Sequence, residues 1–305
     1  MCFKIILISF HIIINIVQLI KKGKVKDIYE VDKETLVFHF TDRVSAFDVL
    51  MNNSIPYKGK VLCDFAVFWF SSLKVNNHFI RKIDRDKILV KRLVMIPIEC
   101  VVRGYMYGGL FSRYKKGEYE NIPEELCSYF KNNEFIVASK LPFLLFDPST
   151  KSDEHDLPIT EEQIIKNDIL SKVEFDKIKL LSLNLYNQMD NIIKSSSNYI
   201  LADVKFEFGK DPLTGEIVLA DSLGPDEYRL WQSDKYSPGR LQDSFDKQIL
   251  RDWLIEIGFK KTIDDFSIQG KKPESPHLPS DMINKISDRY IEAYEQITKT
   301  DFKKN

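Results

Sequence analysis

Three charged side chains interrupt an apolar run near residue 200, in the stretch NYILADVKFEFGKDPLTGEIVLADSLGPDEYRLW. Because successive side chains of a strand point to opposite faces, Asp203, Lys205 and Glu207 are expected on one face, together with Leu201. The glycines and proline that follow predict a turn, and the returning strand ends at Asp221. A hairpin brings Asp221 back beside Glu207 or Asp203, depending on the register. Such carboxylates with a lysine suit a hard cation and a polyphosphate; the alternative is an ordinary sheet with a solvated polar face.

Basic residues occur in two further segments that could meet an anion. Lys24 and Lys26 follow Gly23 at the start of a predicted strand, where glycine lets the backbone approach phosphates and lysines supply charge. The alternative there is a solvated basic turn. Arg103 leaves an apolar strand for a glycine-rich loop that ends at Gly109, and its guanidinium can fork onto a phosphate or a carboxylate. The alternative for Arg103 is a surface ion pair.

Residues 147–156 combine hydroxyl groups, a histidine, acids and a lysine, including Lys151 and Asp156. This segment is either a functional loop or a solvated one. A second arginine, Arg229, follows the predicted hairpin.

The composition limits the class of protein. The chain has 305 residues, 44% of them hydrophobic and 29% charged, which is typical of a soluble globular protein of one large or two modest domains. A formal net charge of −1 argues against a dominant nucleic-acid surface. Four cysteines at positions 2, 63, 100 and 127 include no CxxC pair, so reduced thiols in an intracellular protein are expected. The five histidines show no metal-ligand spacing.

Residues 3–20 are nearly all apolar, which resembles the core of a signal peptide or a short membrane anchor. Polar residues such as His11, Asn15 and Gln18 are spaced through them, and no small-residue cleavage site follows. We therefore expect a cytoplasmic protein in which this stretch is either a packed terminal segment or the result of a poorly defined gene start, and keep a membrane-tethered or organelle-targeted form as the alternative.

The pattern of apolar residues predicts an α+β chain. The expected elements are a β-hairpin over 22–41, a buried helix over 61–73, strands over 88–92 and 95–103, a loop over 140–158, a helical region over 160–195 opened by a capping box at Thr160, the hairpin around Asp221, and helices over 243–257 and 280–297, the last capped by Ser280.

Together these motifs resemble the SAICAR synthetase family of purine biosynthesis. The resemblance rests on GKVKDIYEV, TDRVSAFDV, GKVLCDFAVFWF, IPIECVVRGYMYGG, FDPSTKSDEHD, ILADVKFEFG, PDEYRLW, DSFDKQILRDWL and RYIEAYEQIT, and it runs from Gly23 to the C-terminus. It implies an apolar extension over 1–22, a small β-rich domain over 23–92 that resembles a kinase N-lobe and covers ATP, and a larger ATP-grasp-like domain over 93–305 with C-terminal helices.

The resemblance also implies an ATP-dependent amide ligase. Such an enzyme joins the carboxylate of carboxyaminoimidazole ribonucleotide to the amine of L-aspartate and releases SAICAR, ADP and phosphate. A carboxylate resists amine attack because its leaving group would be oxide, so phosphorylating it to an acyl phosphate makes the reaction accessible. Phosphoryl transfer needs positioning and charge neutralisation, which lysines, arginines and magnesium provide.

Site residues follow from the matching motifs. The residues implied for ATP and Mg²⁺ are Gly23, Lys24, Lys26, Met95, Glu207 and Asp221, with Glu207 and Asp221 as metal ligands. The residues implied for the ribonucleotide are Asp48, Arg103, Gly109 and Arg229. The residues implied at the reacting centre are Lys151, Asp156 and Lys205. For Asp48 a helix cap is the alternative.

Three positions depart from the family pattern. Gly109 stands where a serine is usual, Ser222 where an acid is usual, and Tyr228 where a serine is usual. We expect all three near the substrate pocket. They keep two alternatives open, a kinase-like phosphotransferase and a nucleotide-binding protein with impaired ligase activity. The oligomeric state, monomer or homo-oligomer, is left open.

Overall fold

The structure is a computed structural model that describes residues 18–304, except 131–133, 152–155, 246–247, 269 and 272. Most of the predicted apolar terminal segment therefore lies outside the described residues. Within the described part, no helix is long and apolar enough to cross a membrane.

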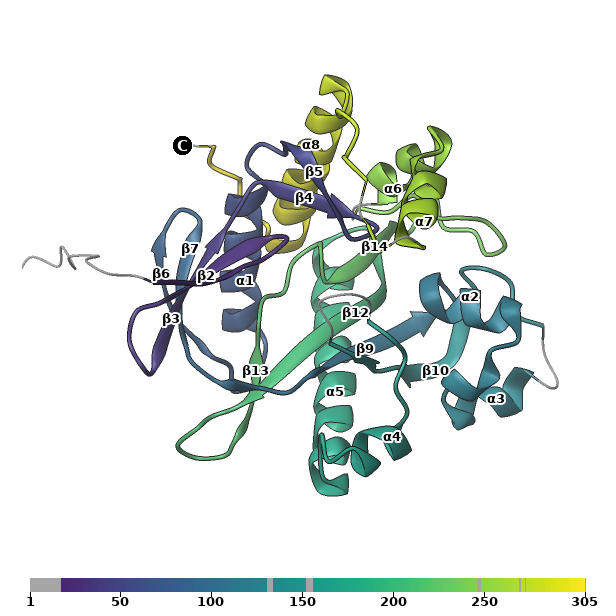
Figure 1. Cartoon of the computed structure of the whole chain (residues 1–305), viewed down its shortest axis with the longest axis horizontal. Helices are drawn as coiled ribbons and strands as arrows, with labels where there is room; N and C mark the ends of the chain where they lie inside the picture. Colours follow the sequence, from purple (N-terminus) through teal and green to yellow (C-terminus); the bar gives the residue numbers. More distant parts are fainter. Residues whose placement is uncertain are drawn as a thin grey trace, which may run out of the picture.

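The chain folds into N-terminal sheets, a larger central sheet and C-terminal helices, an α+β arrangement (Figure 1). The first sheet has five antiparallel strands in the order β1 (Gln18–Lys22), β2 (Lys26–Glu30), β3 (Thr35–Phe40), β7 (Lys87–Lys91) and β6 (Phe79–Asp84). The predicted hairpin is confirmed for β2 and β3, and Asp32 stabilises its turn by accepting hydrogen bonds from the amides of Glu34 and Thr35. Lys22 belongs instead to β1, so the last five residues of the predicted extension form a strand.

Two further elements complete the N-terminal part of the chain, up to β7. A two-stranded sheet joins β4 (Arg43–Ala46) to β5 (Val49–Ser54), and α1 (Lys58–Ser72) packs against β3, β6 and β7. The expected buried helix is confirmed, with ten of its residues buried.

The second sheet has seven strands. Its main path is β10 (Lys140–Phe146), β9 (Ile98–Tyr105), β12 (Tyr199–Lys210) and β13 (Ile217–Ala220), while β14 (Tyr228–Gln232) and β8 (Val94–Met95) also pair with β12, and β11 (Ser149–Thr150) pairs with β9. Residues 140–146 were expected in a loop. They form an edge strand, because the apolar side chains of Leu141, Leu145 and Phe146 are buried there.

The helices lie around this sheet. They are α2 (Gly108–Lys116), the short 3₁₀ helix η1 (Tyr119–Asn121), α3 (Glu124–Phe130), α4 (Glu161–Lys166), α5 (Lys172–Ser196), α6 (Gln248–Glu256), α7 (Phe259–Ser267) and α8 (Ser280–Thr298). The capping box at Thr160 is confirmed, and a second one at Ser171 restarts the helical region as α5. The residue before α8 is Pro279, so the predicted cap at Ser280 is wrong.

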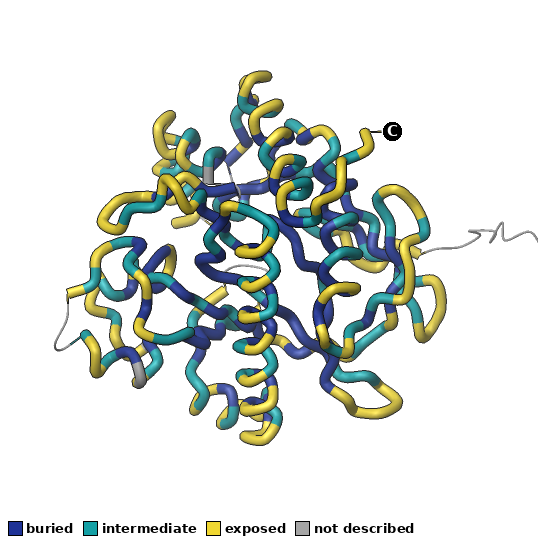
Figure 2. Tube along the Cα trace, turned by 180° about the vertical axis from the view of Figure 1, so that it is seen from behind, coloured by how far each residue is buried: buried dark blue, intermediate teal, exposed yellow. Residues whose placement is uncertain are grey.

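Helix α5 covers one face of β9 and β12, and its outer side faces solvent (Figure 2). A Cβ placed on Gly104 would lie 2.4 Å from the hydroxyl of Tyr186, so only glycine permits this close approach. The same hydroxyl donates a 2.5 Å hydrogen bond to the carbonyl of Leu201. The main apolar cluster continues from Phe38 in the first sheet to Phe206 in the second and Tyr290 in α8.

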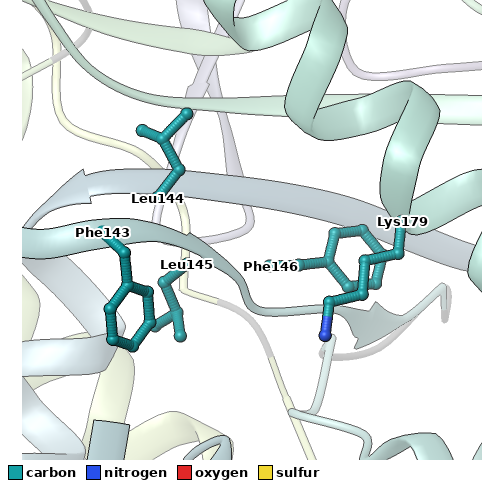
Figure 3. Close-up of a pocket in the computed structure, with 5 residues that line it drawn as sticks. All are labelled: Phe143, Leu144, Leu145, Phe146 and Lys179. Atoms are coloured by element: carbon teal, nitrogen blue, oxygen red, sulfur yellow. The ribbon is translucent and has the colours of Figure 1, made fainter. Parts of the chain in front are cut away.

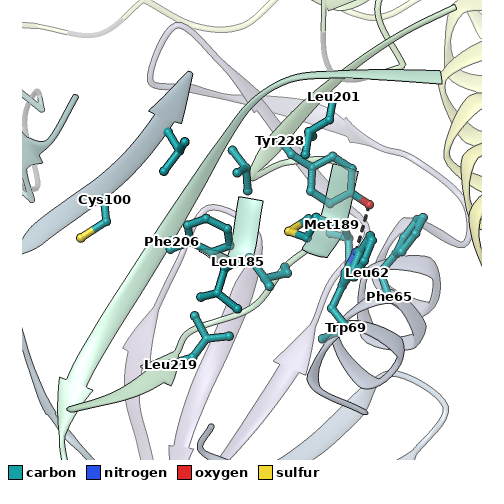
Figure 4. Packing of buried hydrophobic residues seen from close by; sticks show 14 of the residues in the cluster. Leu62, Phe65, Trp69, Cys100, Leu185, Met189, Leu201, Phe206, Leu219 and Tyr228 are labelled. Atoms are coloured by element: carbon teal, nitrogen blue, oxygen red, sulfur yellow. Dashed lines mark hydrogen bonds between the residues drawn. The ribbon is translucent and has the colours of Figure 1, made fainter. Parts of the chain in front are cut away.

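The alternation expected along β12 fails at its first half. The pairing with β14 shifts between Leu201 and Asp203, so Ala202 is an extra residue in the strand, as in a β-bulge. Leu201 therefore packs in the main core with Phe206, rather than on the face that carries Asp203 (Figure 4). Asp203, Lys205 and Glu207 keep the expected alternation.

Candidate functional site

The hairpin of β12 and β13 brings two carboxylates together beside two lysines. Glu207 lies opposite Ala220, which places Asp221 next to Glu207 and decides the register that the sequence left open. Lys26 of β2 forms an ion pair with Asp221 and donates a 2.9 Å hydrogen bond to the hydroxyl of Ser222. Lys151, which follows β11, forms an ion pair with Glu207. Segments more than 100 residues apart in the chain therefore converge on this pair of acids.

Lys205 joins the same group through a residue that sequence reasoning did not single out. Its ammonium lies 2.6 Å from a carboxylate oxygen of Glu99 and 3.7 Å from one of Glu207. Burial lowers the pKa of Lys205, but the charges of Glu99 and Glu207 outweigh it and hold the pKa above its ordinary value. The lysine is therefore a fixed cation at neutral pH.

The two central carboxylates have opposite pKa shifts. Burial, followed by the charge of Asp221, raises the pKa of Glu207, and the nearby lysines compensate only in part. Burial also raises the pKa of Asp221. The ammonium groups of Lys26 and Lys151 lower this pKa by a larger amount, so its net shift is downward. An added cation between these carboxylates would relieve their mutual repulsion.

The second cluster contains the arginines and lies on the same face of the sheet. Arg103 of β9 donates through Nε to Asp147 at 2.5 Å, and its Nη1 lies 3.6 Å from Asp203 of β12. Arg229 of β14 donates through Nη1 to the same Asp203 oxygen at 2.6 Å. Asp203 therefore forms ion pairs with two arginines and is not part of the group around Glu207 and Asp221. The reason is that β9 and β14, which carry the arginines, flank β12 at this position.

Asp147 is a buried carboxylate between two guanidiniums, since Arg113 of α2 also reaches it at 2.6 Å. Burial raises the pKa of Asp147, but Arg103 and Arg113 lower it more, so it is a fixed anion. Sequence reasoning missed Glu99, Arg113 and Asp147 as site residues. The spacing of Glu99 and Arg103, four residues apart on one strand face and charged within an apolar run, is a signal that could have identified the glutamate.

The loop after β9 lies against Arg229. The guanidinium carbon lies 4.8 Å from the ring centroid of Tyr107, and a Cβ on Gly108 would meet a guanidinium nitrogen at 3.3 Å. Gly108 also adopts a positive φ of 60°, which favours glycine. Gly109 is exposed, and a Cβ placed on it would meet nothing within 4 Å, so the usual serine would fit there.

Lys24 forms an exposed ion pair with Asp48, whereas Lys26, two residues on, forms an ion pair with Asp221. Asp48 lies in the turn between β4 and β5 with a positive φ of 61°, so it is not a helix cap. Gly23 permits the tight turn before β2, since a Cβ there would lie 2.6 Å from the Lys26 carbonyl oxygen. Arg43 stabilises this turn by donating to the Gly23 carbonyl at 2.8 Å.

Met95 and Asp156 are both exposed. Met95 belongs to β8, pairs with Gly209 at the far end of β12, and is 41% exposed. Asp156 is exposed and directly follows residues 152–155, which lie outside the described part.

The three departures from the family pattern lie in different places, and Tyr228, which was expected near the substrate pocket, lies in the core. The hydroxyl of Ser222 accepts a hydrogen bond from Lys26, and Gly109 follows Gly108, the first residue of α2 and the one that lies against Arg229. Tyr228 is 3% exposed, and its hydroxyl accepts a 3.4 Å hydrogen bond from the indole of Trp69 in the core (Figure 4). Alternation along β14 turns Tyr228 inward when Arg229 faces the site.

An apolar recess of about 240 Å³ lies elsewhere, between β10 and α5 (Figure 3). It is lined by Phe143, Leu144, Leu145, Phe146 and Lys179. The recess contains one charged side chain, so it does not resemble a phosphate site.

Comparisons with known proteins identify the family of this chain. The SAICAR synthetase family model matches residues 19–265. A phosphoribosylaminoimidazole-succinocarboxamide synthase of Nitrosopumilus maritimus is 47% identical over 92% of this chain and 98% of its own, and one of Candida maltosa is 38% identical over 92% and 94%.

Solved structures show the same similarity. The SAICAR synthase of Saccharomyces cerevisiae, complexed with SAICAR, matches 94% of this chain and 96% of its own with a TM-score of 0.79 and 32% identity. A SAICAR synthetase in complex with ADP matches 93% of this chain and 99% of its own with a TM-score of 0.69 and 26% identity. The chain therefore belongs to the SAICAR synthetase family of purine-biosynthesis ligases.

Proposed function

We propose that this protein uses ATP to join carboxyaminoimidazole ribonucleotide to L-aspartate. The ribonucleotide carboxylate takes the γ-phosphoryl group and releases ADP. The aspartate amine then attacks the acyl carbon, the C–O bond to phosphate breaks, and the nitrogen loses a proton to give SAICAR. The observation that carries this proposal is the presence of a lysine–carboxylate cluster and an arginine cluster on one face of β9 and β12.

The spacing of the two clusters supports a bound ribonucleotide between them. Glu207 and Asp203 are four residues apart on β12, which corresponds to about 13 Å along a strand. That separation suits a small nucleotide whose 5′-phosphate lies at the arginines and whose base carboxylate lies near the lysines. Arg103 and Arg229 are held by Asp147 and Asp203 in orientations that suit a forked contact with phosphate.

The lysine–carboxylate cluster supports the triphosphate. Lys26 and Lys151 carry positive charge at the point where the transferring phosphoryl group would lie, and Lys205 stands beside them. Fixed cations at that position stabilise the charge that spreads over the phosphoryl oxygens during transfer. Gly23 and Lys24 would lie along the remaining phosphates, and Met95 beside the adenine.

The same acids fit a magnesium ion. Among the residues that the structure describes, no group of three or more histidine, cysteine or acidic side chains forms a complete metal cage. Glu207 and Asp221 supply two hard carboxylates, and Mg²⁺ usually takes one or two carboxylates plus substrate phosphates and water. When bound, the ion would neutralise phosphate charge, and Lys26 and Lys151 would then be free to meet the phosphates.

We further propose the two-part organisation of the chain, with residues 23–92 as an ATP-covering domain that resembles a kinase N-lobe and residues 93–305 as an ATP-grasp-like domain. ATP would lie between them, near Lys26 on one side and Asp221 on the other. Closure of the two parts excludes water that would hydrolyse an acyl phosphate. Asp48, Gly109 and Asp156 would contact the substrates in the closed state.

The test is ADP release from ATP and Mg²⁺ with carboxyaminoimidazole ribonucleotide, with aspartate added or withheld. We expect ADP formation to depend on aspartate and a product whose mass equals that of SAICAR. ADP release that is independent of aspartate, with a phosphorylated product, would instead support the kinase-like phosphotransferase. ATP binding without any turnover would support an impaired ligase.

A further inference from the structure

A short segment of the chain, residues 76–78, joins the first sheet to β13, the strand that Asp221 directly follows. The amide of Leu219 in β13 donates to the carbonyl of Asn76 at 3.0 Å, and the amide of His78 donates back to the carbonyl of Leu219 at 3.1 Å. The carbonyl of His78 in turn accepts from the amide of Lys91 at 2.8 Å, at the end of β7. Backbone hydrogen bonds therefore run from β7 through His78 to β13.

The side chain of His78 extends this connection to Asp221. Its Nε2 lies 2.9 Å from the backbone carbonyl oxygen of Asp221. A carbonyl only accepts, so Nε2 carries the hydrogen. The ring is 2% exposed and packs edge-on against Phe38 at 5.4 Å and Phe70 at 5.3 Å between centroids, which fixes its orientation. Burial lowers the pKa of His78 to about 4, so the imidazole is neutral at pH 7.

The contact falls at a backbone position that requires support. Asp221 adopts a left-handed φ of 61°, which costs free energy for a residue other than glycine. This conformation directs the Asp221 carboxylate to Lys26, whose ammonium lies 5.1 Å from the ring centroid of Phe38. Phe38 thus contacts both the lysine that pairs with Asp221 and the histidine that bonds its carbonyl.

We propose that His78 is a positioning residue that holds the Asp221 carboxylate in place for the metal–nucleotide complex. This inference rests on the proposed role of Asp221 in binding magnesium. It adds a residue that touches neither metal nor substrate, and it explains why a buried imidazole lies at the junction of the two sheets. A merely structural histidine would contribute to stability without affecting metal affinity selectively.

The experiment measures binding of Mn²⁺ to the full-length protein in the presence of ADP, by electron paramagnetic resonance of free Mn²⁺. Binding of ADP without metal and the melting temperature are measured in parallel. His78→Phe keeps the edge-on packing but leaves the Asp221 carbonyl without its donor. His78→Gln keeps an N–H donor of similar reach. The matched control is Phe79→Leu, which removes the neighbouring ring stacked on Phe70 and leaves the Asp221 contact intact.

We expect His78→Phe to weaken Mn²⁺ binding about tenfold, because the loss of a buried hydrogen bond is of that order. His78→Gln and Phe79→Leu should bind Mn²⁺ within about threefold of the wild-type value, with ADP affinity in the absence of metal unchanged throughout. Wild-type Mn²⁺ affinity in His78→Phe, or an equal loss in Phe79→Leu, would overturn the inference. Absence of Mn²⁺ binding by the wild-type protein would instead overturn the magnesium assignment, and the role of His78 with it.

Discussion

Replacing Arg229 by lysine tests the assignment of the arginine cluster to the ribonucleotide. The guanidinium donates to Asp203 at 2.6 Å and lies 4.8 Å from the ring centroid of Tyr107, so its plane is held by two neighbours. In that orientation it can still present a second N–H to phosphate. A lysine keeps the charge but cannot bond Asp203 and fork onto a phosphate together.

The magnitude follows from the loss of one charge-assisted hydrogen bond. Such a bond contributes about 1.5–3 kcal/mol, so we expect the KM for the ribonucleotide to rise about 10- to 150-fold in Arg229→Lys. The KM for ATP should stay within about twofold, because the arginine lies at the other cluster. Steady-state kinetics with each substrate varied in turn measures both values.

The chain offers a matched control in Arg289, which also combines an aromatic and a polar contact. Arg289 lies on α8. Its guanidinium lies 5.5 Å from the ring centroid of Phe245 and donates to the carbonyl of Ser244 at 2.7 Å. Arg289→Lys should leave both KM values near wild type. A rise in the KM for ATP in Arg229→Lys, or an unchanged KM for the ribonucleotide, would refute the reasoning.

Three further predictions concern charged residues of the site and of the core. Glu207→Gln should lower kcat about a hundredfold or more at saturating substrates, because it weakens the metal-assisted charge stabilisation; wild-type kcat would contradict the metal assignment. Lys58→Met should lower the free energy of unfolding in urea by about 3–5 kcal/mol, because it leaves the buried carboxylate of Asp226, 2.8 Å from the ammonium and 2% exposed, without its cation. Adding Asp226→Asn should recover part of this loss. An unchanged free energy of unfolding in Lys58→Met would contradict the structural role of the ion pair. Burial and the charge of Asp226 raise the pKa of Glu227 from 4.5 to about 8, so the stabilisation is complete below pH 4.5 and is lost as pH rises to about 8. The melting temperature should therefore fall more steeply from pH 5 to 8 in the wild type than in Glu227→Gln, and parallel curves would contradict the shift.

Local patterns in the sequence determined several parts of the structure. Period-two alternation and turn residues predicted the hairpin of β2 and β3 and the hairpin of β12 and β13, because both signals depend on residues close together in the chain. The capping box at Thr160 was identified for the same reason. The family motifs placed the charged residues in the order in which the strands carry them.

Long-range pairing decided the remainder. The sequence left open whether Asp221 meets Glu207 or Asp203, because register depends on how β12 packs against β9, β13 and β14 together. A single extra residue at Ala202 turned Leu201 into the core, and no local pattern signals such a bulge.

The partners of the charged groups were likewise set by tertiary structure. Asp147 lies 44 residues from Arg103, and His78 lies 143 residues from the carbonyl that it bonds. Sequence alone singled out Lys26, Lys151, Lys205, Glu207 and Asp221 as candidates for a phosphate-transfer site, but not Glu99, Arg113 or Asp147. Only the folded chain determined which charged groups pair with one another, because buried charges take partners from whichever strands pack beside them.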